Sequence, residues 1–155
     1  MLITDRIITN KKQLKKKCSP IKTEEIKTIK NMAEHFYFIM EQNQGVGLAA
    51  PQIGISKRFF IMKYKEDNII CINPEIIYSS PIIEIDSQEG CLSVSGKQFI
   101  VKRASMITVK YIDLENNSIK KDLIGYDAII FQHEFDHLDG ILISDKGKEI
   151  IDIQR

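Results

Sequence analysis

Two histidines four residues apart, His133 and His137, stand in the string QHEFDHLDG towards the end of the chain. On a helix this spacing places both imidazoles on one face, about 5–6 Å apart, where they can hold one metal ion. Glu134 directly follows the first histidine, so its carboxylate can reach a metal-bound water and act as a general base. Burying such polar side chains on an apolar helix is costly without a partner. The motif therefore predicts a metal site.

Two histidines are too few ligands, because a catalytic site needs a third protein ligand and one position left for water. No histidine follows His137, and Glu149 is too close in sequence to be a convincing ligand. The remaining soft donors are cysteines. Cys91 follows a predicted strand in the string EGCLS, where a glycine lets the backbone approach a bound group, whereas Cys71 has the alternating neighbours of a strand residue. Spacing alone therefore favours Cys91 over Cys71 modestly.

A third segment, GVGLAAPQ at 45–52, contains two glycines and two alanines among eight residues. Small residues in this density indicate a backbone that approaches a ligand or a buried helix closely. A plain glycine-rich turn between a helix and a strand would have the same appearance. The segment also lacks the Lys and the Ser or Thr of a phosphate-binding loop. Taken alone, the segment therefore fits either a close backbone approach or a plain turn.

The surrounding elements predict a mixed fold. A helix from Thr23, which can act as its N-cap, to about Gln44–Gly45 has one apolar stripe, made by Ile26, Ile29, Ala33, Phe36 and Met40. Stretches rich in Ile, Val and Tyr, separated by turn residues, predict strands at 58–64, 69–73, 76–79, 82–86, 106–113 and 119–124. A second helix, N-capped by Asp127 and running to about Leu138, carries the histidine motif. Its apolar residues lie all around the axis, which predicts burial.

Composition is that of an ordinary globular chain: 155 residues, 43% hydrophobic, 28% charged and a net charge of +1. The length suits one domain over residues 1–155. The charge balance gives no reason to expect DNA binding, and the apolar runs are too short to span a membrane. The N-terminal segment lacks the apolar core of a signal peptide, and three cysteines without a CxxC pair do not form a disulfide framework. We therefore expect a soluble, cytoplasmic protein.

Together, GVGLAAPQ (45–52), EGCLS (89–93) and QHEFDHLDG (132–140) resemble the three motifs of peptide deformylases, in that family's order and near its usual separations. The resemblance implies an α+β fold in which antiparallel β-sheets surround a buried HExxH helix, with an amphipathic helix in the N-terminal part. It also implies a hydrolase that removes the N-formyl group from the initiator formyl-methionine of nascent polypeptides and releases formate. The sequence departs from the family pattern at Ser95, where proline is usual.

The resemblance also implies roles for individual residues. It implies three metal ligands: Cys91, His133 and His137. One divalent ion is expected there, Fe2+ in the first place, with Zn2+, Ni2+ or Co2+ as substitutes. Metal-bound hydroxide would attack the formyl carbon with Glu134 as general acid and base, while the Gln52 amide and the Leu92 backbone N–H stabilise the oxyanion. By position, the substrate-binding residues are Gly45, Val46, Gly47, Ile129 and Ile130.

Two other functions use the same residues. One is a zincin-type peptidase built on HExxH, against which the missing third His or Glu counts. The other is a catalytically silent, peptide-binding member of the fold.

Glu89 and Arg103 form either an ion pair that steadies the Cys91 loop or a plain surface pair. The chain ends soon after His137, so the long C-terminal helix that some members use on the ribosome is short or missing, and ribosome docking is not expected.

Overall fold

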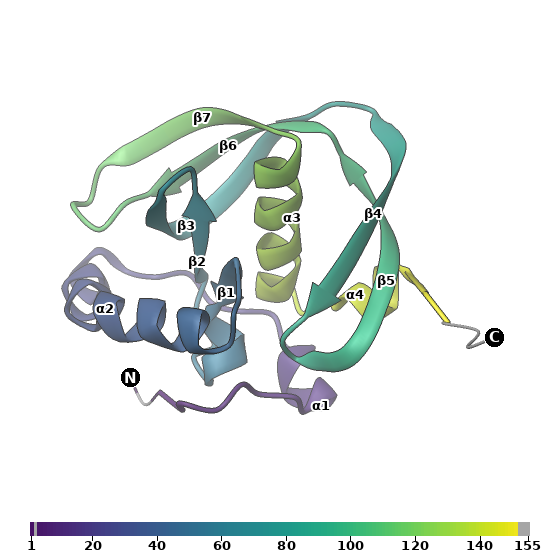
Figure 1. Ribbon diagram of the computed structural model, residues 1–155. Helices are drawn as coiled ribbons and strands as arrows, with labels where there is room; N and C mark the ends of the chain where they lie inside the picture. The colour runs from purple at the N-terminus through teal and green to yellow at the C-terminus, as the bar shows by residue number, and fades with distance from the viewer. Residues whose placement is uncertain (2, 152–155) are drawn as a thin grey trace.

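The protein is described here by a computed structural model that covers residue 1 and residues 3–151, with the backbone alone for 82–86. Two sheets enclose a central helix, α3 (Tyr126–Leu138), and a second long helix, α2 (Ile26–Gln42), lies on the outer side of one sheet (Figure 1). The predicted α+β fold class with antiparallel sheets is confirmed. Among the described residues, no helix is long and apolar enough to cross a membrane.

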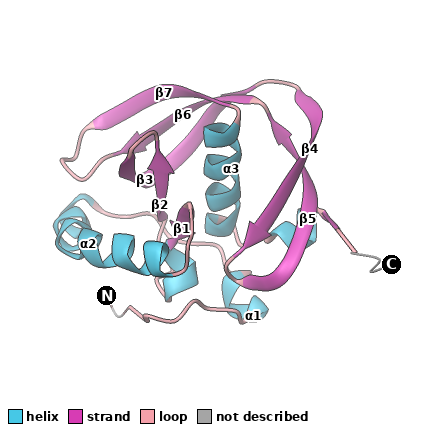
Figure 2. Ribbon diagram, in the orientation of Figure 1, coloured by secondary structure: helices cyan, strands magenta, loops and turns pink. Residues whose placement is uncertain are grey.

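The remaining elements of the described residues are short helices and eight strands (Figure 2). The short helices are α1 (Lys11–Leu14), η1 (Thr23–Glu25), η2 (Ala50–Ile53) and α4 (Ile143–Lys146). The first four strands are β1 (Gly47–Ala49), β2 (Phe59–Tyr64), β3 (Asp67–Ser79) and β4 (Ile82–Cys91). The last four are β5 (Val94–Ala104), β6 (Met106–Ile112), β7 (Ser118–Ile124) and β8 (Lys148–Glu149).

The strands form a five-stranded sheet in the order β1-β2-β3-β6-β7 and a three-stranded sheet in the order β4-β5-β8. All pairings between these strands are antiparallel. The β4–β5 hairpin therefore leaves the larger sheet after β3 and returns to it at β6. As Figure 1 shows, this excursion carries β4 and β5 to the other side of α3. The hairpin thus brings residues around position 90 to the helix that carries the histidine motif.

Strand β2 explains why the larger sheet holds a helix on each face. Its residues 59–62 are all buried, and successive side chains point to opposite faces of the sheet. Phe59 and Ile61 pack in the cluster that includes the apolar stripe of α2. Phe60 and Met62 pack in the cluster that includes the apolar residues of α3. A continuous apolar run is what a strand covered on both faces requires.

The first predicted helix is confirmed in its apolar face and corrected at its ends. Its predicted stripe is buried along the whole of α2. Thr23 is not the N-cap: it begins the 3-10 turn η1, and Glu25 occupies the N-cap position of α2. The Glu25 carboxylate accepts a hydrogen bond from the Lys22 backbone N–H at 2.8 Å, which closes this turn ahead of the helix. The helix ends at Gln42, and Gln44 already has a positive φ of 54°.

The second predicted helix is confirmed as α3, with a different N-cap. Gly125 occupies the cap position, and Asp127 lies in the first helical turn, where its charge suits the positive end of the helix dipole. Beyond Leu138 the chain turns at Gly140, which has a φ of +73°. A side chain on this glycine would collide with the Lys15 backbone, so the turn needs glycine for both conformation and space.

Two strand predictions are wrong in detail. The turn expected at Asn73-Pro74 is a bulge inside the continuous strand β3, where the register with β6 shifts between Ile72 and Glu75. The Asn73 side chain donates to the Ile21 carbonyl and accepts from its N–H, both at 2.8 Å, which holds this irregular point. Strand β5 was not predicted at all, because its first residues, Ser95 to Gln98, have the composition of a turn.

Candidate active site

Three donor side chains meet between β4 and α3. Cys91 is the last residue of β4, rather than a loop residue, and His133 and His137 lie one turn apart on α3. Their donor atoms all lie within 4.8 Å of one another. The two imidazole rings have centroids 5.2 Å apart, as the i, i+4 spacing predicts. Cys71, the alternative donor, is fully buried in the core between β3 and α3 and is not part of the cluster.

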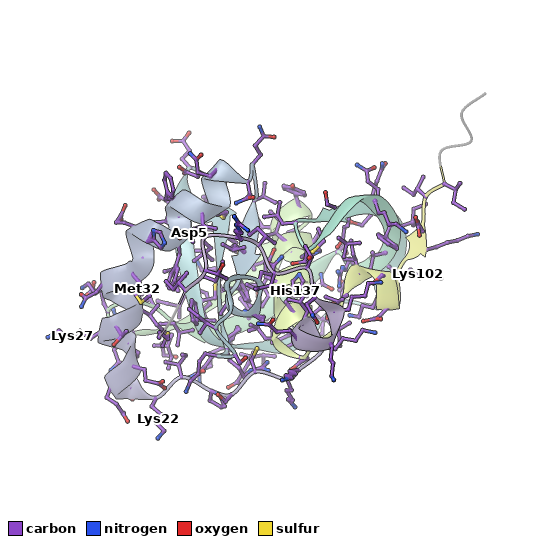
Figure 3. The ribbon with its side chains drawn as sticks, turned by 90° about the horizontal axis from the view of Figure 1, so that it is seen from below. Asp5, Lys22, Lys27, Met32, Lys102 and His137 are labelled. Atoms are coloured by element: carbon purple, nitrogen blue, oxygen red, sulfur yellow. The ribbon has the colours of Figure 1, made fainter. Side chains whose placement is uncertain are left out.

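The spacing of this cluster fits a single metal ion. Cys91 Sγ and His137 Nε2 are 3.4 Å apart. A tetrahedral ion with ordinary bonds to sulfur and imidazole nitrogen would separate two such atoms by about 3.6 Å. Burial, followed by the charges of His133 and Arg103, lowers the pKa of His137 to about 3, so its ring is neutral. Burial would also lower the pKa of His133, but hydrogen bonds to Cys91 and Glu89 raise it to about 10, so binding of an ion would displace a proton from His133. Figure 3 shows His137 in the interior of the molecule.

A buried ion pair orients His133. Its Nδ1 lies 2.9 Å from Glu89 Oε1, and Arg103 donates from Nε and Nη2 to the two oxygens of Glu89, each at 2.9 Å. Arg103 is 3% exposed and Glu89 is 7% exposed, so the pair is internal and not a surface pair. Burial alone would raise the pKa of Glu89, but the hydrogen bonds from Arg103 and His133 lower it to about 2. Glu89 is therefore ionised and holds the imidazole in place.

The same network continues to two residues that the sequence analysis did not assign. Arg103 Nη1 donates to Asp136 Oδ2 at 2.6 Å, and Lys146 Nζ donates to Asp136 Oδ1 at 2.9 Å. Asp136 is 8% exposed although it lies on the buried helix α3. An acidic residue inside an apolar helix was the signal for a buried partner. No signal in the sequence pointed to Lys146, which reaches the network from α4.

Glu134 is a buried carboxylate with a free oxygen. It is 4% exposed, and its Oε2 has no hydrogen-bond partner among the described residues. Burial, with a contribution from the charge of Glu89, raises the pKa of Glu134 to about 7, although the positive charges of His133 and Arg103 oppose the shift. A carboxylate with a pKa near neutrality can both accept and return a proton.

The amide of Gln52 has one fixed orientation. Its Oε1 accepts a hydrogen bond from the Ala49 backbone N–H at 2.9 Å, so its Nε2 faces the opposite way. There Nε2 donates to Ser93 Oγ at 3.1 Å and approaches Cys91 Sγ at 3.7 Å. Gln52 is 1% exposed, so neighbouring groups prevent the amide from turning over. The N–H donors of Gln52 therefore point towards the donor cluster.

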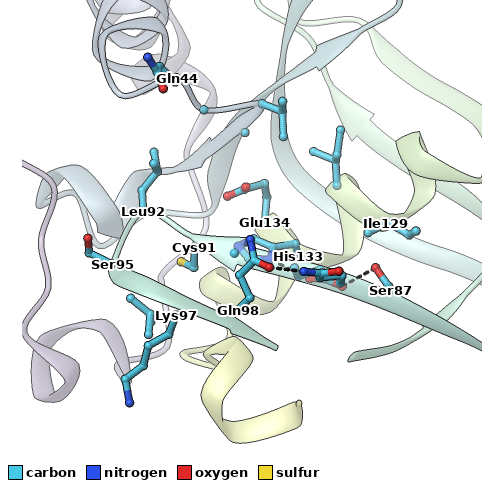
Figure 4. A pocket seen from close by; sticks show the side chains of 18 of the residues that line it. Gln44, Ser87, Cys91, Leu92, Ser95, Lys97, Gln98, Ile129, His133 and Glu134 are labelled. Carbon is cyan, nitrogen blue, oxygen red and sulfur yellow. Dashed lines mark hydrogen bonds and ion pairs between the residues drawn. The ribbon is translucent and has the colours of Figure 1, made fainter. Parts of the chain in front are cut away.

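The cluster opens into a cleft of about 1240 Å³ (Figure 4). Residues 45–47 at β1 form one wall, and the β4–β5 hairpin and α3 supply the others. His137 is buried and does not line the cleft; the other predicted site residues that line it are Gly45, Val46, Gly47, Gln52, Cys91, Leu92, Ile129, Ile130, His133 and Glu134. Lining residues that the sequence analysis missed include Gln88, Lys97, Gln98 and Tyr126. Three of these come from the hairpin whose second strand was not predicted.

The fold and the site define a class of protein: an α+β protein with a Cys/His/His centre beside a buried glutamate, as in hydrolases that use one metal ion. The chain belongs to the polypeptide deformylase family, whose model matches residues 5–151. The family resemblance predicted from the three motifs is therefore confirmed. The relatives and structural neighbours of the chain are peptide deformylases, which are enzymes, so the protein is a member of an enzyme family.

Three comparisons show how close the similarity is. The chain is 42% identical over 135 residues to the peptide deformylase of Thermotoga neapolitana, covering 87% of this chain and 81% of the relative. It resembles the crystal structure of the Thermotoga maritima enzyme with a TM-score of 0.85 and 37% identity, over 94% of this chain and 97% of that one. It also resembles a Met-Ala-Ser-bound deformylase of Acinetobacter baumannii, with a TM-score of 0.86 and 31% identity, over 94% and 98% of the two chains.

Proposed function

We propose that this protein hydrolyses the N-formyl group of formyl-methionyl nascent peptides in the cytoplasm and releases formate. The observation that carries the proposal is the cluster of Cys91, His133 and His137 beside the buried carboxylate of Glu134, in a chain of the deformylase family. We propose residues 1–155 as one catalytic domain. The substrate is the formylated peptide itself.

The three donors of the cluster would hold one divalent ion. When bound, the ion supplies Lewis acidity, which lowers the pKa of water towards neutrality and polarises a carbonyl oxygen. A thiolate with two imidazoles suits Fe2+, Zn2+, Ni2+ and Co2+ alike, and we propose Fe2+ on the family resemblance. Glu89 and Arg103 support this site from behind, because they fix the ring orientation of His133.

Glu134 performs the proton transfers. Its carboxylate accepts a proton from the attacking water as the water oxygen bonds to the formyl carbon. It then gives this proton to the nitrogen of the departing amine as the carbon–nitrogen bond breaks. Its pKa of about 7, raised by burial, suits both transfers near neutral pH. The products are formate and a free methionyl amine.

Negative charge develops on the formyl oxygen during the attack. The Gln52 amide, oriented by the Ala49 N–H, and the backbone N–H of Leu92 donate hydrogen bonds to this oxygen. Both groups line the same cleft as Cys91. Because their positions are set before the substrate arrives, they stabilise the charge without reorganisation.

The peptide binds along the edge of β1. In the described part of the five-stranded sheet, β1 is an edge strand that pairs only with β2, so its other edge can pair with an extended peptide. Residues 45–47 supply this backbone, and Ile129 and Ile130 line the pocket for the methionine side chain. The similar deformylase with bound Met-Ala-Ser supports a peptide in this cleft.

The test is formate release from formyl-Met-Ala-Ser by protein loaded anaerobically with Fe2+, Zn2+, Ni2+ or Co2+. We expect formate in stoichiometric amounts with free Met-Ala-Ser and no turnover of acetyl-Met-Ala-Ser. We expect the Fe2+ form to be active and to lose activity in air, while the Ni2+ and Co2+ forms remain stable. Cleavage of an internal peptide bond would indicate a zincin-type peptidase, and peptide binding without formate release would indicate a silent member of the fold. Either result would contradict the proposal.

A further inference from the structure

Gly47 is a glycine that its backbone conformation does not require. It is the first residue of β1, where it pairs with Met62 of β2. It is not among the glycines with a positive φ, which are Gly54, Gly96, Gly125 and Gly140. A glycine inside a strand loses more conformational entropy on folding than other residues and leaves no side chain to pack. Its presence at this position therefore needs another reason.

The reason lies across the cleft, at Glu134. A Cβ atom on Gly47 would lie 2.8 Å from both Cγ and Cδ of Glu134, and closer still to Oε1. Non-bonded carbon atoms ordinarily stay about 3.5–4.0 Å apart. Pairing of β1 with β2, and the hydrogen bond from the Lys63 N–H to the Val46 carbonyl at 2.8 Å, hold the strand in place. The group that would have to move is therefore the side chain of Glu134.

The alternation of β1 gives a second, independent observation. Leu48 packs in the core on the side of α2, whereas Ala49 packs in the core on the side of α3, so Gly47 and Ala49 share the face towards α3. The Ala49 N–H holds Oε1 of Gln52 at 2.9 Å. This short strand thus contacts both the proposed oxyanion donor and the proposed general base: Gln52 through a hydrogen bond, and Glu134 through close packing.

We infer that Gly47 is a positioning residue for Glu134. Because Gly47 has no side chain, the Glu134 side chain can pack directly against the backbone of β1, and this packing keeps its carboxylate beside the metal ligands. This role is distinct from the peptide pairing proposed for residues 45–47, in which Gly47 would act only through its backbone. The inference rests on the proposed function in its kinetic consequence, but the steric relation can be tested without activity.

The kinetic test compares two alanine substitutions in the same segment. A Cβ on Gly45 would meet Leu92 Cδ1 at 3.1 Å, the Gly47 carbonyl oxygen at 3.3 Å and Met40 Cγ at 3.3 Å, so none of its three nearest atoms belongs to Glu134. We expect Gly47→Ala to lower kcat for formyl-Met-Ala-Ser by about 10²-fold at unchanged metal content, since a displaced catalytic group costs about that much. We expect Gly45→Ala to change mainly KM. If Gly47→Ala, like Gly45→Ala, raised KM and left kcat at the parent value, the inference would be wrong.

The stability test needs no turnover. Glu134→Ala removes Cγ, Cδ and Oε1, which are the atoms that a Cβ on Gly47 would strike. We expect Gly47→Ala to lower the Tm of the parent protein and to leave the Tm of Glu134→Ala unchanged. An equal loss in both backgrounds, or failure of the double variant to fold, would overturn the inference. If the parent released no formate, the proposed function would fail while this comparison still decided the role of Gly47.

Discussion

Among single residues, the identity of the third metal ligand can be tested by replacing each of the three cysteines in turn. We expect Cys91→Ser to lose most of its metal and activity, because a hydroxyl has neither the charge nor the softness of a thiolate. Cys18→Ser and Cys71→Ser should keep the metal, since both thiols are buried outside the cluster. Metal content of the three purified variants is the measurement. If Cys71→Ser emptied the site and Cys91→Ser did not, the assignment of Cys91 as the third ligand would be wrong.

Gln52 allows the donor role of its amide to be separated from its structural role. Gln52→Glu keeps an oxygen that can accept from the Ala49 N–H but replaces the Nε2 donor, whereas Gln52→Leu loses both. We expect kcat to fall by about 10²–10³-fold in both variants, as for the loss of an oxyanion donor. Both variants should also lower the free energy of unfolding: Gln52→Leu by about 1 kcal/mol, because it loses hydrogen bonds, and Gln52→Glu by more, because it places an additional carboxylate at a position that is 1% exposed. Parent-like kcat in Gln52→Leu would argue against an oxyanion role.

Sequence reasoning reached some of these residues and not others, for physical reasons. His133, Glu134 and His137 could be predicted because the period of a helix alone brings them together. The Glu89–Arg103 pair could be named but not assigned to the interior, because burial depends on how β4 and β5 pack. Lys146 could not be found, since its contact with Asp136 depends on where α4 docks.

Among the secondary-structure elements, one buried charge network joins β4, β5, α3 and α4. Arg103 connects Glu89 with Asp136, and Lys146 adds a half-exposed cation. We expect Arg103→Met to lower the free energy of unfolding by about 3–5 kcal/mol, because two buried carboxylates, Glu89 and Asp136, lose their guanidinium partner. It should also weaken metal affinity by about 10–100-fold, since Glu89 would no longer hold His133 firmly.

Matched variants give this prediction its control. Lys146→Met should cost about 1 kcal/mol, and Lys15→Met, which removes the exposed pair with Asp145, about 0.5 kcal/mol or less. Urea unfolding and metal titration of the three variants measure both effects. The network would lose its assigned importance if Arg103→Met were no more destabilising than Lys15→Met.

The elements that could be predicted are those with a strong local pattern. Helix α2 has one apolar stripe, and α3 is apolar all round, so both were found with their burial. Strand β5 was missed for two reasons: its first residues have the composition of a turn, and Arg103, one of the residues that alternate inwards with Phe99 and Val101, is charged. An arginine inside a strand indicates an exposed face unless its buried partners are already known.

For the molecule as a whole, the burial of ionisable groups makes the free energy of unfolding fall at alkaline pH. Burial raises the pKa of Cys18 from 9.0 to about 11, against the charge of Arg58. Burial also raises the pKa values of Cys71 and Tyr111. These groups ionise more easily in the unfolded chain, so the stability of the folded protein is intact below pH 9 and declines as the pH rises towards 11.

Urea unfolding across this window tests the prediction. The free energy of unfolding should fall with rising pH, and Cys18→Ala combined with Cys71→Ala should make the decline shallower. Tyr111 remains in that variant and keeps part of the slope. A free energy of unfolding that stayed constant or rose through the window would show that these groups are not protected by burial.

The proposed mechanism requires that Glu134 performs the proton transfers beside a metal held by Cys91, His133 and His137. Glu134→Gln tests it most directly, because the amide has the same shape but cannot accept or return a proton. The measurement is steady-state formate release from formyl-Met-Ala-Ser at full metal occupancy. We expect unchanged metal content, a kcat lower by about 10²–10⁴-fold and a much smaller change in KM. Turnover near the parent rate at full metal occupancy would contradict this mechanism.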